Sequence, residues 1–245
     1  MKNIPLYDVR KINDLRDMLS QSMALFSDHT AFLVKDQKGG AYRSIKLSAY
    51  HADVEAFGTA LHDLGMAGCR VAIIAETRYE WYVTYMATVN GVGIIVPLDK
   101  ELPPHELASL LNRSKADVLV YSQAKANDIA AIRDQIPAVR CFICTDQPAP
   151  SASGDLRFTD LLTKGRALLE AGDHRFADYP LDPDAMRILL FTSGTTDQAK
   201  AVMLSHHNVC ANLMAMSSMI FIGTDDTFLS VLPLHHTYEC ICGFL

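Results

Sequence analysis

The stretch that decides the fold class is Val71-Ala-Ile-Ile-Ala75, a continuous apolar run without polar alternation. Such a run is typical of a strand that is covered on both faces, as in a parallel sheet. Comparable runs recur at 93–97 (GIIVP), 117–121 (DVLVY) and 139–143 (VRCFI). The segments 79–90, 104–114 and 124–136 each fit a crossover helix between these runs. The alternation predicts an α/β fold with a doubly wound, largely parallel sheet.

The N-terminal part of the chain carries two helical patterns and one alternating pattern. Apolar residues from Leu15 to Leu25 keep a spacing of three and four, which predicts a helix. The segment 31–44 is predicted to form a β-hairpin, because two glycines at 39–40 suit the positive φ of its turn. A second helix is predicted over 47–64, and the turn-rich segments 147–155 and 178–184 are predicted loops.

The composition and charge indicate what kind of molecule the protein binds and in which compartment it works. Of the 245 residues 49% are hydrophobic and 20% are charged, which is typical of a globular protein. A formal net charge of −6 makes nucleic acid a poor partner. No signal peptide or transmembrane segment is recognisable, so we expect a cytoplasmic protein. The six cysteines are expected to be reduced and mostly buried.

The chemistry is concentrated in residues 187–208, RILLFTSGTTDQAKAVMLSHHN. An apolar strand leads into Thr192-Ser-Gly-Thr-Thr196, and Lys200 follows. Small residues let backbone N–H groups converge on an anion, hydroxyls add donors, and one ammonium supplies charge, so the pattern indicates phosphate binding. An ordinary solvated Ser/Thr-rich loop is the alternative. The segment is not the P-loop of the NTPases, because no Gly-Lys-Ser/Thr closes it.

This ordered segment resembles the phosphate-binding signature of the adenylate-forming, or AMP-binding, enzymes, the superfamily of acyl-CoA synthetases, nonribosomal-peptide adenylation domains and luciferases. Residues 71–81 and 93–99 resemble the strand-helix-strand passage of the long-chain acyl-CoA synthetase branch. Residues 232–239, LPLHHTYE, are similar to the next motif of the family, whose histidine falls on His236. The resemblance covers nearly the whole chain.

The resemblance implies a reaction in which a carboxylic acid, expected to be a fatty acid, attacks ATP to give an acyl-adenylate and then an acyl-CoA thioester. The residues implied in phosphate binding are Thr192, Ser193, Gly194, Thr195, Thr196 and Lys200. Mg²⁺ would share this task, although no residue is assigned as its ligand. His236 would orient the acid and the adenylate, and CoA would be the second substrate.

The resemblance also implies how the domain is divided. Residues 46–222 are expected to form a first α/β subdomain, while 1–45 and 223–245, including a strand at 228–232, would belong to a second, incomplete sheet. The chain is then expected to be an N-terminal fragment of a synthetase, because the family's adenine-binding motif and C-terminal lysine do not occur in it. Such a fragment is predicted to be inactive alone, without pyrophosphate release, and to self-associate through 228–245 and the hairpin.

Two other interpretations use the same residues. A degenerate, non-catalytic module that holds a nucleotide or a partner is the main alternative. A zinc site is suggested by Cys141-x-x-Cys144 with the histidine pairs 206–207 and 235–236, but the cysteines lie in what looks like a buried strand, which disfavours it.

Asp197 stands where the family usually has glycine, and a carboxylate beside phosphates opposes their binding. If it faces the phosphates, Asp197→Gly in a full-length parent should tighten ATP binding by up to about tenfold, as measured by calorimetry. Weaker binding in the variant would indicate that Asp197 holds Mg²⁺.

Overall fold

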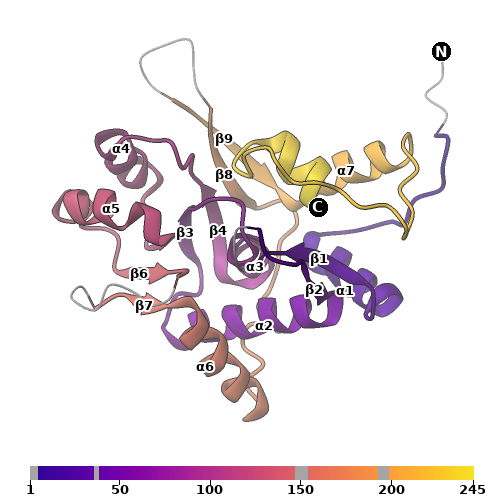
Figure 1. Ribbon diagram of the computed structural model, residues 1–245, viewed down its shortest axis with the longest axis horizontal. Coiled ribbons are helices and arrows are strands. Elements are labelled where there is room, and N and C mark those ends of the chain that lie inside the picture. Colours follow the sequence, from indigo (N-terminus) through magenta and orange to yellow (C-terminus); the bar gives the residue numbers. More distant parts are fainter. Residues whose placement is uncertain (1–4, 36–38, 147–153, 193–198) are drawn as a thin grey trace.

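The computed structural model describes residues 5–35, 39–146, 154–192 and 199–245 (Figure 1). The helices are α1 (Leu15–Phe26), α2 (Leu47–Asp63), α3 (Tyr79–Ala87), α4 (Pro104–Ser114), α5 (Ala126–Ile132), α6 (Phe158–Glu170) and α7 (His206–Ser217). The strands are β1 (Thr30–Val34), β2 (Arg43–Lys46), β3 (Cys69–Ile74), β4 (Gly93–Pro97), β5 (Val118–Tyr121), β6 (Cys141–Cys144), β7 (Leu156–Arg157), β8 (Met186–Thr192) and β9 (Lys200–Ser205).

The main sheet has seven strands in the order β7-β6-β5-β3-β4-β8-β9. All neighbours are parallel except β8 and β9, which pair antiparallel. The chain starts in the middle of the sheet at β3, moves to β4 on one side, and returns to β5 on the other. This confirms the predicted α/β fold with its largely parallel sheet.

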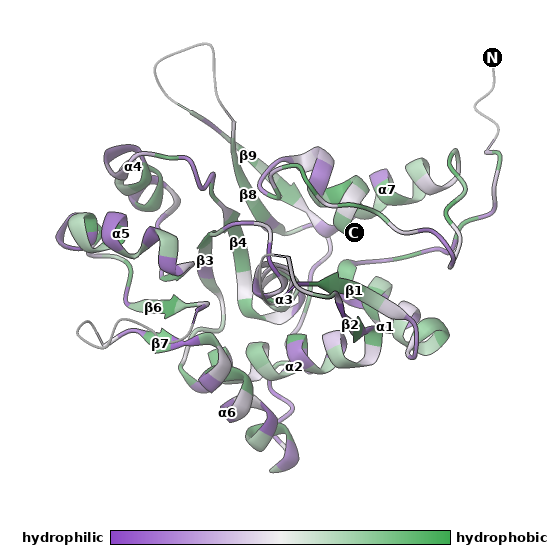
Figure 2. Ribbon diagram, viewed as in Figure 1, coloured by the Kyte–Doolittle hydropathy of each residue, from purple (hydrophilic) through white to green (hydrophobic). Residues whose placement is uncertain are grey.

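Helices cover both faces of this sheet, and Figure 2 shows its central strands in the colour of apolar residues. Val71 and Ile73 of β3 enter a core shared with α1, α2, α3, α6 and α7. Ala72 and Ile74 enter a second core shared with α4 and α5. Side chains of a strand alternate between its faces, so the unbroken apolar runs reflect burial on both sides. We call these the α2 face and the α4 face.

The predicted hairpin is confirmed as the antiparallel pair β1–β2, although its turn lies partly outside the described residues. The segment at 79–90 is helical as predicted, with α3 continuing into a wide turn at Thr88–Val92. The predicted helix at 124–136 is shorter, because α5 is flanked by single 3₁₀ turns. The division into a first α/β subdomain at 46–222 and a second, incomplete sheet stays a prediction.

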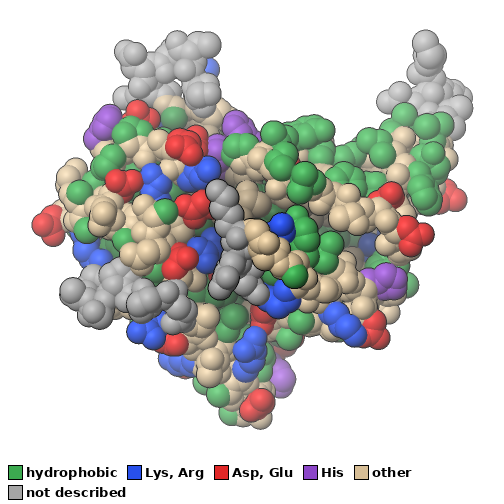
Figure 3. Space-filling model, in the orientation of Figure 1, with side chains coloured by type: hydrophobic (Ala, Val, Ile, Leu, Met, Phe, Trp, Pro, Cys, Tyr) green, Lys and Arg blue, Asp and Glu red, His purple; other side chains and the backbone are tan. Residues whose placement is uncertain are grey.

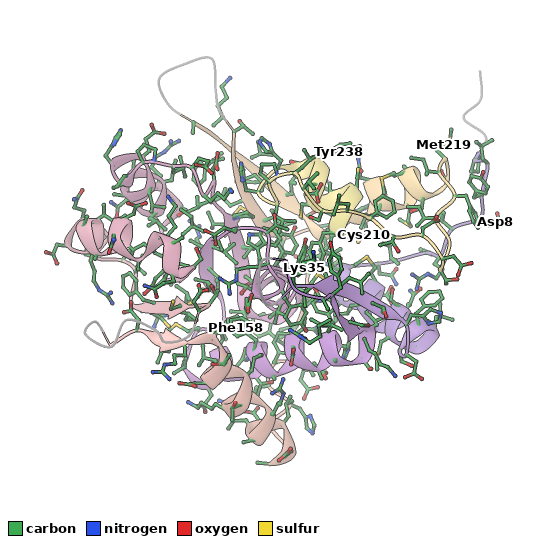
Figure 4. The ribbon with its side chains drawn as sticks, in the orientation of Figure 1. Asp8, Lys35, Phe158, Cys210, Met219 and Tyr238 are labelled. Carbon is green, nitrogen blue, oxygen red and sulfur yellow. The ribbon has the colours of Figure 1, made fainter. Side chains whose placement is uncertain are left out.

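Sequence reasoning missed α6. Its apolar residues Phe158, Leu161 and Leu162 are buried against α2, and the ring of Phe158 stacks on Phe57 at 4.6 Å between centroids (Figure 4). The two helices come so close that a Cβ at Gly165 would lie 1.8 Å from the carbonyl oxygen of Ala56. The spacing of the apolar residues in 158–169 was a readable signal for this helix.

The predicted strand at 228–232 is wrong. The segment has no regular structure, and Phe228, Leu229, Val231 and Leu232 are exposed. A strand needs a partner for its backbone groups, and within the described ranges no other strand pairs with this segment. Figure 3 shows apolar side chains gathered over the C-terminal part of the molecule. Self-association through this region stays a prediction. None of the helices in the described ranges is long and apolar enough to cross a bilayer.

We predict that Gly165→Ala lowers the free energy of unfolding by roughly 3 kcal/mol, at the upper end for overpacking, because the methyl group meets rigid backbone of α2. Denaturant titration measures this. Thr163→Ala, at an exposed position of the same helix, should change the free energy of unfolding by less than about 0.5 kcal/mol. Equal stability of the two variants would show that α2 and α6 are not in close contact.

Candidate functional site

The β8–β9 pair fixes the positions of two of the predicted phosphate-binding residues. Thr192 lies directly opposite Lys200 in the antiparallel register, and both are exposed. Directly opposite residues in such a pair point to the same side of the sheet. The structure therefore brings these two side chains together. Ser193, Gly194, Thr195 and Thr196, as well as Asp197, lie outside the described residues.

The alternation of side chains along β8 shows to which face of the sheet Thr192 and Lys200 point. Ile188 and Leu190 are buried in the core of the α2 face, whereas Leu189 and Phe191 pack on the α4 face. The next residue, Thr192, accordingly belongs to the α2 face, and so does its cross-strand neighbour Lys200. A hydroxyl and an ammonium thus project together from the end of β8, where the buried part of the strand stops.

The turn that carries His236 packs on the same face of the sheet. The backbone N–H of His236 donates to the carbonyl of Pro233 at 3.0 Å, which closes the turn, and a helix at Glu239–Phe244 follows. Leu234 and Cys240 on either side are buried in the core of the α2 face, but His236 itself is exposed. No hydrogen bond or ion pair joins His236 to Thr192 or Lys200 within the described ranges. The structure gathers the three residues on one face without direct contact.

His235 has a buried environment that the sequence did not reveal. Its Nε2 lies 3.5 Å from Oδ2 of Asp99, and the side chain is 13% exposed. Asp99 is fixed at the carboxyl end of β4, where its Oδ1 accepts from the N–H of Glu101 at 2.9 Å. Burial lowers the pKa of His235, while the Asp99 carboxylate partly offsets this effect. Its ring lies 4.5 Å from the His236 ring, so the buried histidine supports the exposed one.

A second set of contacts holds the segments that flank His236. The hydroxyl of Tyr82 in α3 donates to Oγ of Ser230 at 3.1 Å, and Ser230 Oγ donates to Oε1 of Glu239. Glu239 is only 5% exposed. A buried carboxylate is costly unless it accepts hydrogen bonds, so this chain of hydroxyls fastens the start of the last helix to α3. The turn that presents His236 is therefore held on both sides.

The other histidine pair has a structural role. Nδ1 of His206 accepts from the N–H of Leu15 at 2.9 Å, and its Nε2 donates to the carbonyl of Val89 at 3.0 Å. Both ring nitrogens are thus occupied inside the core. Burial lowers the pKa of His206, which favours the neutral ring. His207 is exposed beside Asp184.

The cysteine pair of the zinc hypothesis does not converge. Cys141 is buried in the core of the α2 face and Cys144 in that of the α4 face, on opposite sides of β6. Burial raises the pKa of Cys141 to about 11, which disfavours the thiolate that zinc requires. In the part of the chain that the structure describes, no three His, Cys, Asp or Glu side chains are grouped to hold a metal ion.

A wide groove of the described structure lies elsewhere. It is a groove of about 1400 Å³ between the β1–β2 hairpin, α1 and the segment 224–230. Aromatic rings of Phe32, Tyr50 and Tyr82 line it, together with Arg78. Thr192, Lys200 and His236 do not line this groove. The groove is thus separate from the described residues of the predicted phosphate site.

A comparison with protein families connects this geometry to a known class. The family profile described as "AMP-binding enzyme" matches residues 19–245. The chain belongs to the AMP-binding enzyme family. The resemblance carried by residues 187–208 and 232–239 is thereby confirmed.

Individual relatives and solved structures of this AMP-binding chain agree with the family. It is 28% identical over 245 residues to fatty acyl-CoA synthetase A of Dictyostelium discoideum, covering 97% of this chain and 35% of that protein. It is 30% identical over 179 residues to long-chain-fatty-acid–CoA ligase 6 of Mus musculus, covering 69% of this chain and 26% of the relative. The chain thus spans about a third or less of these two relatives.

The fold is similar to that of a long-chain-fatty-acid–CoA ligase from Archaeoglobus fulgidus. The TM-score is 0.80 at 18% sequence identity, with 98% of this chain and 45% of that chain covered. The N-terminal domain of a protein named FACL13 from Mycobacterium tuberculosis gives a TM-score of 0.75 at 22% identity, with 94% and 54% covered. At these identities the likeness supports the fold.

We predict that native-state stability falls as the pH is lowered from 7 to 5, partly because of His206. Its folded pKa lies below the unfolded value of about 6.5, so the unfolded state binds a proton that the native state excludes. Its contribution is therefore present above pH 6.5 and is lost as the pH falls, by at most about 1.4 kcal/mol per pH unit.

Denaturant titrations of His206→Gln should show a weaker dependence on pH than the wild type. His207→Gln, which alters the exposed neighbour, should keep the wild-type dependence. An unchanged pH dependence in His206→Gln would contradict the buried neutral ring.

Proposed function

We propose that this AMP-binding chain contributes the polyphosphate-binding strand pair of an enzyme that uses ATP to join a fatty acid to CoA. The observation that carries the proposal is the placement of Thr192 and Lys200 as opposite neighbours on the face that also holds His236. The names of the relatives, fatty acyl-CoA synthetase and long-chain-fatty-acid–CoA ligase, support the substrate class.

The reaction explains why these residue types are needed. An oxygen of the acid attacks the α-phosphorus of ATP, the bond to the bridging oxygen breaks, and pyrophosphate leaves. The thiol of CoA then attacks the acyl carbon, and AMP leaves with the electron pair of the broken bond. The first step brings an anion to a polyanion, so it requires donors and positive charge in fixed positions.

Each residue of the site has a distinct task in this proposal. Lys200 would neutralise phosphate charge, and the Thr192 hydroxyl would donate to a phosphate oxygen. The segment 193–196 would add backbone N–H groups and hydroxyls. His236 would orient the acid, with His235 behind it and Asp99 fixed to β4. Mg²⁺ would bind mainly to the phosphates of ATP and would neutralise part of their charge.

A nucleotide-binding chain without catalysis is the second candidate function. The observation that favours it is Asp197, an acidic residue within the phosphate-binding segment. Both candidates require ATP to bind at Lys200, so they differ in adenylate formation. Hydroxylamine trapping of an acyl-adenylate, formed from ATP and a fatty acid by a full-length parent, would favour the enzyme.

We predict that the chain binds ATP in the presence of Mg²⁺ and that Lys200→Ala weakens binding by about tenfold or more, because a charge-assisted contact to phosphate is lost. Isothermal titration calorimetry measures this. Lys164→Ala removes a lysine from α6, remote from β9, and should leave the affinity unchanged. Equal affinities of the wild type and Lys200→Ala would contradict the proposed site.

A further inference from the structure

Arg113, in the last turn of α4, reaches across to the β8–β9 pair. Its Nη2 donates to the carbonyl oxygen of Ala199 at 2.8 Å, over a separation of 86 residues in sequence. Its guanidinium carbon lies 5.4 Å from the centre of the Phe191 ring. Ala199 immediately precedes Lys200, and Phe191 immediately precedes Thr192. One side chain thus contacts β8 and the residue that precedes β9, beside the last described pair of the two strands.

The two contacts lie on the side of the sheet opposite to the phosphate-binding side chains. Phe191 and Ala199 pack on the α4 face. Thr192 and Lys200 point to the α2 face, by the alternation along β8 and the register with β9. Arg113 therefore supports the strand pair from behind. Its position suits a residue that supports the backbone around Lys200 better than a residue that binds the same phosphates as Lys200.

Among the described residues, the end of the β8–β9 pair has few buried contacts. Thr192 opposite Lys200 is the last pair of the register, and residues 200–203 of β9 are exposed. β9 is also an edge strand of the sheet as described. Terminal pairs of an exposed edge open readily, because few buried contacts hold them. A hydrogen bond to a strand carbonyl and a cation–π contact on the partner strand both favour the closed pair.

The chemistry of the side chain fits this task. A planar guanidinium can stack on an aromatic ring while an edge N–H donates to a carbonyl, which a lysine ammonium does less well. Within the described ranges no carboxylate pairs with Arg113, so its recorded contacts are those to Ala199 and Phe191.

We infer that Arg113 is a positioning residue of the polyphosphate site: by holding Ala199 and Phe191 from the α4 face, it keeps Thr192 and Lys200 paired on the α2 face. The inference rests on the proposed function for the identity of the ligand. The bracing itself concerns the chain alone and is measurable without nucleotide.

The first test is amide hydrogen exchange, followed by NMR on the chain without nucleotide. In Arg113→Ala those amides of residues 200–202 that donate to β8 should exchange roughly threefold to tenfold faster, while the protected amides of 204–205 stay unchanged. Arg113→Lys should recover part of the protection through a hydrogen bond to Ala199. Asn112→Ala is the matched control, since it removes a neighbouring side chain of α4 that donates to Gln135 instead. Unchanged exchange in Arg113→Ala would overturn the inference.

The second test is ATP binding as a function of salt. Arg113→Ala should weaken binding roughly threefold to tenfold with the same salt dependence as the wild type, because no phosphate contact is lost. Lys200→Ala should reduce the dependence of ATP affinity on salt concentration. A reduced salt dependence in Arg113→Ala would make Arg113 a direct phosphate ligand and overturn the positioning role.

Two further outcomes separate the inference from the proposed function. Unchanged affinity in Arg113→Ala, beside a loss in Lys200→Ala, would overturn the inference alone. Failure of the wild type to bind ATP would refute the proposed function and with it the assignment of a phosphate site, while the exchange data would still decide whether Arg113 braces the strands.

Discussion

The register between β8 and β9 is the constraint on which the site depends. Pairing of Thr192 with Lys200 puts a hydroxyl and an ammonium on the α2 face, and a slip of one residue would turn Lys200 toward α4. The burial of Ile188 and Leu190 on one face and of Leu189 on the other fixes β8 in its orientation. The hydrophobic pattern of a buried strand thereby determines where the charge of an exposed residue is placed.

The rest of the α2 face is tied to this strand pair by polar contacts inside the core. The helix that follows β9 begins at His206, whose ring joins the first residue of α1 to the wide turn after α3. The turn that carries His236 is fastened to α3 through Ser230 and Glu239. Segments that are far apart in sequence are thus held around one face. The proposed reaction between two anions requires such fixed positions, because it depends on oriented hydrogen-bond donors and positive charge.

The sequence predicted the sheet well because its strands are buried on both faces, and such burial leaves apolar runs like Val71–Ala75. The family could be predicted as well, since small hydroxyl residues followed by Lys200 are a local pattern, whereas the roles of the site residues stay predictions. The prediction of a strand at 228–232, which the family resemblance implied, was wrong because no strand of the described ranges pairs with this segment. The roles of His206 and Arg113 could not be predicted, because their partners are distant in sequence and depend on the assembled fold.

The most direct measurement of the central claim is a crystal structure of the chain with a non-hydrolysable ATP analogue. The account predicts that the triphosphate lies against Thr192 and Lys200, on the face of the sheet that carries His236. A triphosphate bound on the α4 face beside Arg113, or in the groove beside Arg78, would contradict it.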